Sequence, residues 1–276
     1  HFANTLFNCM RGGVFVDNGS VPVSDLARFL EHRNHAVHRA HAAWLSSLGE
    51  HVDRRELLSQ ASVQNDPDLE RLCHEYLPLT FSRRHGDPSR PRNMFAIKVQ
   101  DDDGNEVLDS QGTWRDIFQN WEALCYSFPI YLESIVAKFV NASTVDGFNP
   151  YRVTRDGIDW EAPDPENQWS NIGYWGDHQI IYLLRLLEGL DKFDPDALPS
   201  MLGRELFSYA DVPYRIRQYD AILRNSKNTI DFDGDRDREI AERTERGYSA
   251  LTMQLHRIRT VLGDCIRTKI SNPSAR

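Results

Sequence analysis

Residues 113–125 read TWRDIFQNWEALC, and this stretch sets the class of fold. Its apolar side chains recur at spacings of three and four residues, which places them on one face of an α-helix. Thr113 precedes the helix and Asp116 follows three residues later, the pattern of a capping box. The stretch therefore predicts a helix over about 113–127 with one buried face. The expected buried side chains are Trp114, Ile117, Phe118, Trp121, Leu124 and Cys125.

Helical patterns continue on both sides of this stretch. Ser24 is expected to cap a helix that runs to about Leu48. Asp66 and Pro67 are typical of a helix start, and Pro78 is expected to end that helix. Further helices are predicted at about 130–142, 177–190, 196–208, 213–225 and 235–263.

One segment has the period of a β-strand instead. Phe95, Ile97 and Val99 alternate with polar residues, a turn follows at 103–105, and apolar residues return at 107–108. This pattern predicts a small β-hairpin insertion near 94–109. No internal repeat or clear boundary interrupts the chain, so residues 1–276 are expected to form a single, mainly helical domain.

The composition excludes several classes of partner. The 32 Lys and Arg residues against 41 Asp and Glu give a net charge of −9, whereas nucleic acids and anionic membranes require a basic surface. No apolar run approaches the roughly 18 residues of a membrane span. The chain opens at His1 without a basic and then apolar leader, so we expect no signal peptide, a cytoplasmic location, and a piece of a longer parent chain. Four widely spaced cysteines predict reduced, mostly buried thiols.

Aromatic and acidic residues are concentrated in one region. Five of the six tryptophans lie between 114 and 175, interleaved with carboxylates. Indole rings pack against the C–H faces of sugars while charged groups bind the hydroxyls, so this composition suits a sugar site. For Trp114 and Trp121 a place in the core is the favoured interpretation. Trp160, Trp169 and Trp175 fall outside any periodic stripe, in a long connection over 143–176 of a kind that is often functional.

Each candidate carboxylate has a structural alternative. Asp116 could serve only as a capping residue, or could stand with Arg115 at a helix start that faces a ligand. Asp159 and Glu161 would point the same way in an extended segment. Hydrolysis of a glycosidic bond needs two carboxyl groups in different environments, which such a pair could supply. The alternative for this pair is a solvated acidic loop.

Three further groups of residues also have a structural alternative. Asp177 is most simply a helix N-cap, but with Trp175 and His178 it would also place titratable groups at a helix mouth. The histidines of 32–41 recur every three residues and so wind around a helix, which disfavours a shared metal ion. The acids of 231–242 resemble a calcium loop, but Arg236 stands where that loop needs glycine, so an acidic helix start is favoured.

Three segments carry a resemblance to a known family: GTWRDIFQNWE at 112–122, NPYRVTRDGIDWE at 149–161 and GYWGDHQ at 173–179. They resemble a segment of large bacterial proteins related to six-hairpin, (α/α)-barrel glycosidases and glycoside phosphorylases. The resemblance covers about Asn4 to Asp233. It implies an (α/α) helical-hairpin barrel, whole or partial, with Asp116 and Asp177 at the mouth of the substrate funnel. The Trp-Asn-Asp type of segment that bears the general acid in such phosphorylases is missing here.

The leading hypothesis is a carbohydrate-active domain that binds or cleaves the glycosidic bonds of an oligosaccharide, by hydrolysis or phosphorolysis. No metal or organic cofactor is expected, and inorganic phosphate would be the co-substrate of a phosphorylase. The alternative is a non-catalytic helical scaffold or interaction domain within a longer parent chain. The candidate catalytic residues are Asp116, Asp159, Glu161 and Asp177, and the candidate substrate-binding residues are Trp114, Arg115, Trp160, Trp175 and His178.

Overall fold

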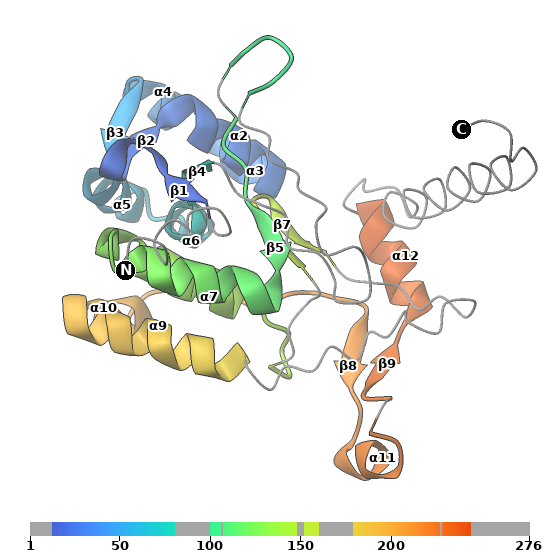
Figure 1. Ribbon diagram of the computed structural model, residues 1–276. Helices are drawn as coiled ribbons and strands as arrows, with labels where there is room; N and C mark the ends of the chain where they lie inside the picture. The colour runs from blue at the N-terminus through green and yellow to red at the C-terminus, as the bar shows by residue number, and fades with distance from the viewer. Residues whose placement is uncertain are drawn as a thin grey trace, which may run out of the picture. The chain divides into compact units, whose positions relative to one another are not determined.

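The computed structural model describes residues 13–80, 100–105, 107–147, 152–159, 179–226 and 228–243 (Figure 1). The chain divides into two compact units. The first comprises His1–Trp160 and Tyr174–Ala210, and the second comprises Glu161–Gly173 and Asp211–Arg276. A single domain over 1–276 stays a prediction. None of the helices in the described ranges combines the length and apolar character that crossing a bilayer would require.

Helices dominate the first unit (Figure 1). They are α2 (Val23–Arg33), α3 (His35–Ala40), α4 (Ala42–Ser47), α5 (Arg54–Ser62), α6 (Pro67–Glu75), α7 (Trp114–Cys125), α8 (Leu132–Asn141), α9 (Gln179–Phe193) and α10 (Ala197–Leu202), with short 3-10 helices η1 (Val16–Gly19) and η2 (Pro129–Tyr131). Strand pairs are small and antiparallel: β1 (Val14–Phe15) with β4 (Leu79–Thr80), and β2 (Ser20–Pro22) with β3 (His51–Asp53). A three-stranded sheet has the order β5 (Gln111–Thr113), β6 (Arg152–Thr154), β7 (Gly157–Asp159).

Two hydrophobic cores organise this unit. One core lies among α2, α5 and α6 and is built from buried residues between Val21 and Tyr76. The other core joins α7, α8 and α9 to the β1 and β4 strands. Trp114 and Trp121 are both fully buried there, as the core interpretation of the 113–125 stripe predicts. Phe118 packs between them, with ring centroids 4.9 Å from Trp114 and 5.3 Å from Trp121.

The expected helix from Ser24 to Leu48 is broken into α2, α3 and α4. Asn34 has extended backbone angles, and its side chain accepts hydrogen bonds from the Ala36 and Val37 amides, so it ends one helix and caps the next. A second interruption lies at His41. Ser24 is not the cap, because α2 begins at Val23. By contrast, α6 begins after Asp66 with Pro67 at its first position, as predicted.

The second unit contains a β-hairpin where the sequence predicted a helix at 213–225. Its elements are β8 (Tyr214–Ile216), α11 (Tyr219–Arg224), β9 (Ile230–Phe232) and α12 (Gly234–Arg243). Tyr214 and Ile216 alternate with Arg215 and pair with Phe232 and Ile230, so the strand period takes precedence there. Only Tyr219–Arg224 is helical.

The predicted hairpin near 94–109 is described only in part. Its first arm lies outside the described residues. The chain does turn at 101–105, where the Asp101 carboxylate accepts hydrogen bonds from the Asp103 and Asn105 amides and Gly104 has a φ of +84°. The returning residues Val107 and Leu108 are not in a strand. A mainly helical fold with small strand pairs is confirmed, and the barrel stays a prediction.

Candidate functional site

The three-stranded sheet brings two of the predicted carboxylate positions to one end. Thr113 pairs with Arg152, and Arg152 pairs with Asp159, so these three residues form one row across the sheet. β5 leads directly into α7 at Trp114, which places Asp116 in the first turn of that helix (Figure 1). The outer strands of such a row lie about 10 Å apart. The backbones of Asp116 and Asp159 therefore lie at the same end of the sheet.

Close packing explains the glycine at this junction. A Cβ atom on Gly112 would lie 3.0 Å from the Ile117 Cβ, tighter than ordinary packing, so β5 meets the first turn of α7 with no room for a side chain. The sheet and the helix start are thus held together at the residues that flank Asp116.

The other predicted site residues are described less fully. Arg115, Asp116 and Asp159 are placed by their backbone alone. Trp114 has no exposed ring face, since it is 0% exposed and packs on Phe139 at 4.8 Å between ring centroids. The remaining predicted site residues lie outside the described residues: Trp160, Glu161, Trp175, Asp177 and His178.

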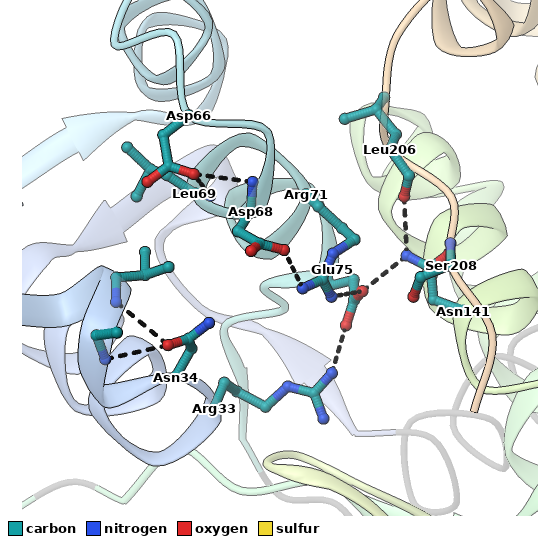
Figure 2. A network of polar contacts seen from close by, with 12 residues as sticks. Arg33, Asn34, Asp66, Asp68, Leu69, Arg71, Glu75, Asn141, Leu206 and Ser208 are labelled. Carbon is teal, nitrogen blue, oxygen red and sulfur yellow. Dashed lines mark hydrogen bonds and ion pairs between the residues drawn. The ribbon is translucent and has the colours of Figure 1, made fainter. Parts of the chain in front are cut away.

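A buried polar network centred on Glu75, shown in Figure 2, was not predicted from the sequence. Glu75 is 2% exposed, and its carboxylate accepts hydrogen bonds from Arg33 at 2.8 Å, Arg71 at 3.2 Å and Asn141 at 2.7 Å. Asn141 also bonds the Leu206 carbonyl and the Ser208 amide. The network thus ties α6 to α8 and to the chain after α10.

A second buried carboxylate holds the turn of the sheet. Asp25 is 3% exposed and accepts hydrogen bonds from Arg155 Nη1 and Nη2 at 2.9 and 3.0 Å and from the Tyr76 hydroxyl at 2.7 Å. Arg155 lies in the turn between β6 and β7, and its carbonyl accepts a hydrogen bond from Lys138 at 3.1 Å. These contacts fix the turn end of the sheet, opposite the end that carries Asp159.

Burial and neighbouring charges shift the pKa values of Glu75 and Lys138 in this interior. Burial alone would raise the pKa of Glu75, but the charges of Arg33, Arg71 and Lys138, with the Asn141 hydrogen bond, lower it below its ordinary value. Burial and the neighbouring Arg33 charge lower the pKa of Lys138 to about 8.

The sequence held one signal that could have predicted the burial of Glu75. This residue continues the apolar stripe of Leu72 and Cys73 on α6.

Several residues of the two metal-like patterns have other partners in the structure. The His41 ring bonds Asp66 at 2.7 Å, whereas His32 lies 3.4 Å from Asp156, so these histidines face different partners. In the second unit, Asp233 caps α12 by accepting hydrogen bonds from the Asp235 and Arg236 amides, as an acidic helix start predicts. Within the described ranges, no group of three or more His, Cys, Asp or Glu residues could hold a metal ion. Cys73 and Cys125 are buried free thiols, as expected.

A cavity in the described part of the first unit lies between the start of α2, α4 and β3. It has a volume of 620 Å³, and all of its lining residues lie between Pro22 and His51. Its polar groups include His38, Glu50 and His51, beside the apolar Val23 and Leu45. One continuous segment of the chain therefore forms the whole cavity.

Comparison with known protein families identifies part of the chain. Residues 15–78 match the family described as glycoside hydrolase family 149 insertion domain 1. This segment, which spans α2 to α6 and the core between Val21 and Tyr76, is therefore related to glycoside hydrolase family 149. The match does not extend to the tryptophan-rich region after residue 113. No curated protein matches the chain.

Proposed function

We propose that the chain is a carbohydrate-active part of a glycoside-hydrolase-related protein, which binds an oligosaccharide and takes part in cleaving its glycosidic bonds. The observation that carries this proposal is the match of residues 15–78 to the family 149 insertion domain. The concentration of tryptophans and carboxylates over 114–177 supports it independently. No metal or organic cofactor is required, and inorganic phosphate is the co-substrate if the reaction is phosphorolysis.

The proposed site lies at the end of the sheet that carries Asp159. Asp116 and Asp159, with Glu161 and Asp177, supply acid, base or hydroxyl contacts. The shared sheet end of Asp116 and Asp159 supports this assignment. A separation of the two working carboxyls of about 5–5.5 Å would indicate retention, and about 6.5–9.5 Å inversion. Residues proposed to bind the sugar rings or orient the acids are Arg115, Trp160, Trp175 and His178. Trp114, fully buried, would support the helix start that carries Arg115.

Calorimetry against a panel of α- and β-linked glucans, with and without inorganic phosphate, tests this proposal. Saturable binding of at least one linkage type is expected, and release of free sugar or sugar phosphate would identify the reaction. The carbohydrate function would be excluded if the folded protein binds no glucan and releases no sugar, and if its longer parent chain gives the same result.

Asp177 separates a binding role from a capping role. Asparagine caps helices as well as aspartate, so Asp177→Asn should leave the unfolding free energy within about 0.5 kcal/mol, whereas Asp177→Ala should cost about 1 kcal/mol. If Asp177 transfers a proton, Asp177→Asn should reduce activity at least about a hundredfold. Denaturant midpoints and glucan titrations of the three proteins measure both effects. Unchanged glucan affinity and activity in Asp177→Asn would remove this residue from the site.

A non-catalytic interaction domain is the second candidate function. The match is to an insertion domain, and the 620 Å³ cavity lies wholly inside that matched segment. On this alternative, residues 15–78 provide a docking surface for the remainder of a longer chain. Substituting both Asp116 and Asp159 by asparagine discriminates the carbohydrate function from the docking function. A carbohydrate site would lose glucan affinity, whereas a docking domain would leave the glucan affinity of the parent protein unchanged.

A further inference from the structure

A second cavity of the first unit has an unusual set of charged groups. It has a volume of 330 Å³ and lies between α5, η2, the first turn of α8, the end of α9 and the chain after α10. Arg54, Arg55 and Arg204 line it together with two carboxylates, Glu133 and Asp194. Leu58, Ile130 and Leu190 supply its apolar wall. The cavity lies apart from the sheet end that carries Asp116 and Asp159.

The arginines of this cavity are only partly paired. The Arg54 side chain is 7% exposed, donates to the Ser134 hydroxyl at 2.8 Å, and forms an ion pair with Glu133 at 3.6 Å. Arg204 donates to Glu70 at 2.6 Å, but its Nε is buried without a hydrogen-bond partner among the described residues. Arg55 is exposed. Among the buried arginine atoms of this wall, the Arg204 Nε is therefore the one without a hydrogen-bond partner among the described residues.

A buried histidine lies behind this wall. His74 is 0% exposed, neither ring nitrogen has a hydrogen-bond partner among the described residues, and its Nδ1 lies 3.8 Å from the Glu133 carboxylate. Burial, with the charges of Arg54 and Arg204, lowers the pKa of His74 to about 3, so the ring is neutral at pH 7. The His74 ring therefore adds no charge to this wall at pH 7.

Two helix starts lie at this cavity, but their amides have partners. α5 begins at Arg54, and the Asp53 carboxylate accepts hydrogen bonds from the Arg55 and Glu56 amides. α8 continues η2, and its Leu132 amide bonds the Pro129 carbonyl. The arginine side chains are therefore the groups that suit an anion here, because guanidinium groups are typical of phosphate recognition.

We propose that this cavity binds a small phosphorylated sugar. The phosphate group lies between Arg54, Arg55 and Arg204, which supply charge-assisted hydrogen bonds. Sugar hydroxyls donate to Glu133 and Asp194, which would repel a bare anion but are suitable acceptors for a polyol. The C–H groups of the ring pack against the apolar wall. The volume lies near the lower end of the range for ligand pockets, which fits one monosaccharide unit.

Isothermal titration calorimetry with glucose 6-phosphate, glucose and inorganic phosphate at constant ionic strength tests the proposal. Glucose 6-phosphate should bind saturably and more tightly than either of the others. Arg55→Ala and Arg204→Gln should each weaken it at least about tenfold, since each removes a charge-assisted hydrogen bond. Arg39→Ala is the matched control, because Arg39 is exposed on α3 and bonds only the His35 carbonyl among the described residues.

Each contrary result overturns a defined part of the proposal. Absence of glucose 6-phosphate binding to the folded wild-type protein, or full affinity in both variants, would exclude the site. Equal affinity for inorganic phosphate would exclude recognition of the sugar, and equal affinity for glucose would exclude recognition of the phosphate. Because Arg55 is exposed, Arg55→Ala tests the site even if Arg204→Gln unfolds the protein. No glucan enters these titrations, so the result is independent of the carbohydrate site proposed above.

Discussion

Replacing Glu75 with glutamine removes one negative charge from the interior while keeping the size of the side chain. Glu75 accepts hydrogen bonds from Arg33, Arg71 and Asn141, and Lys138 adds a further positive charge nearby. A glutamine offers one acceptor oxygen in place of two and turns an NH₂ group toward an arginine. The positive charges of the network then lack their common partner.

The cost follows from the number of bonds and their exposure. Two charge-assisted hydrogen bonds at about 1.5–3 kcal/mol each suggest a loss of about 3–6 kcal/mol. Breaking a buried ion pair by removing one partner costs about 3–5 kcal/mol. The side chains of Arg33 and Arg71 are 22% and 18% exposed, so water compensates them in part. We therefore expect a destabilisation of about 3 kcal/mol, or roughly 6–12 °C in Tm for a domain of this size.

Urea unfolding followed by tryptophan fluorescence and circular dichroism measures this change. Glu56→Gln is the matched control, because the Glu56 side chain is exposed on α5 and bonds only Gln60 among the described residues. That change should alter the unfolding free energy by no more than about 0.5 kcal/mol.

The stability of the wild type should also depend on pH through Glu75. Its pKa in the folded state lies below the ordinary value of 4.5. The resulting stabilisation is fully present above pH 4.5 and is lost as the pH falls through the folded-state pKa. Glu75→Gln should lack this part of the acid dependence. A loss below about 1 kcal/mol at pH 7, or identical pH profiles of variant and wild type, would refute the assigned role of the network.

Two further predictions concern single side chains. Asn34→Ala should cost about 1 kcal/mol in urea unfolding, because it removes the cap of α3, while Asn34→Asp should be nearly neutral; equal stability of all three proteins would contradict the capping role. The pKa of His74 is lowered from 6.5 to about 3, so the unfolded chain takes up a proton below pH 6.5 that the folded protein does not, and stability falls from pH 6.5 toward 3. His74→Leu should reduce this slope by about 1.4 kcal/mol per pH unit, and an unchanged slope would show that His74 titrates normally.

Local signals predicted the elements whose ends depend on neighbouring residues. α6 needs only the Asp66 cap, Pro67 and its apolar stripe, all within ten residues or so, and α7 needs only the stripe around Trp121. The interruption at Asn34 was missed because the apolar period continues through it. There the asparagine side chain satisfies two backbone amides at once, which competes successfully with a continuous helix.

The buried polar networks could not be predicted from the sequence, because their partners are far apart along the chain. Arg155, the partner of Asp25, lies 130 residues away in the sequence, and Asn141, the partner of Glu75, lies 66 residues away. The same holds for the candidate site. The sequence indicated a helix start near Asp116 and an extended segment at Asp159, but only the strand register through Arg152 aligns them.

The buried carboxylates also bear on how the chain could be divided for experiments. A fragment cut to residues 15–78 would keep the apolar core between Val21 and Tyr76. It would lose Arg155 from Asp25 and Asn141 from Glu75, and would uncover Phe15, which stacks on Tyr131 at 3.9 Å between ring centroids. The segment that matches the family therefore differs from the unit expected to be stable on its own, and a soluble fragment should extend beyond Arg155 so that both acids keep their partners.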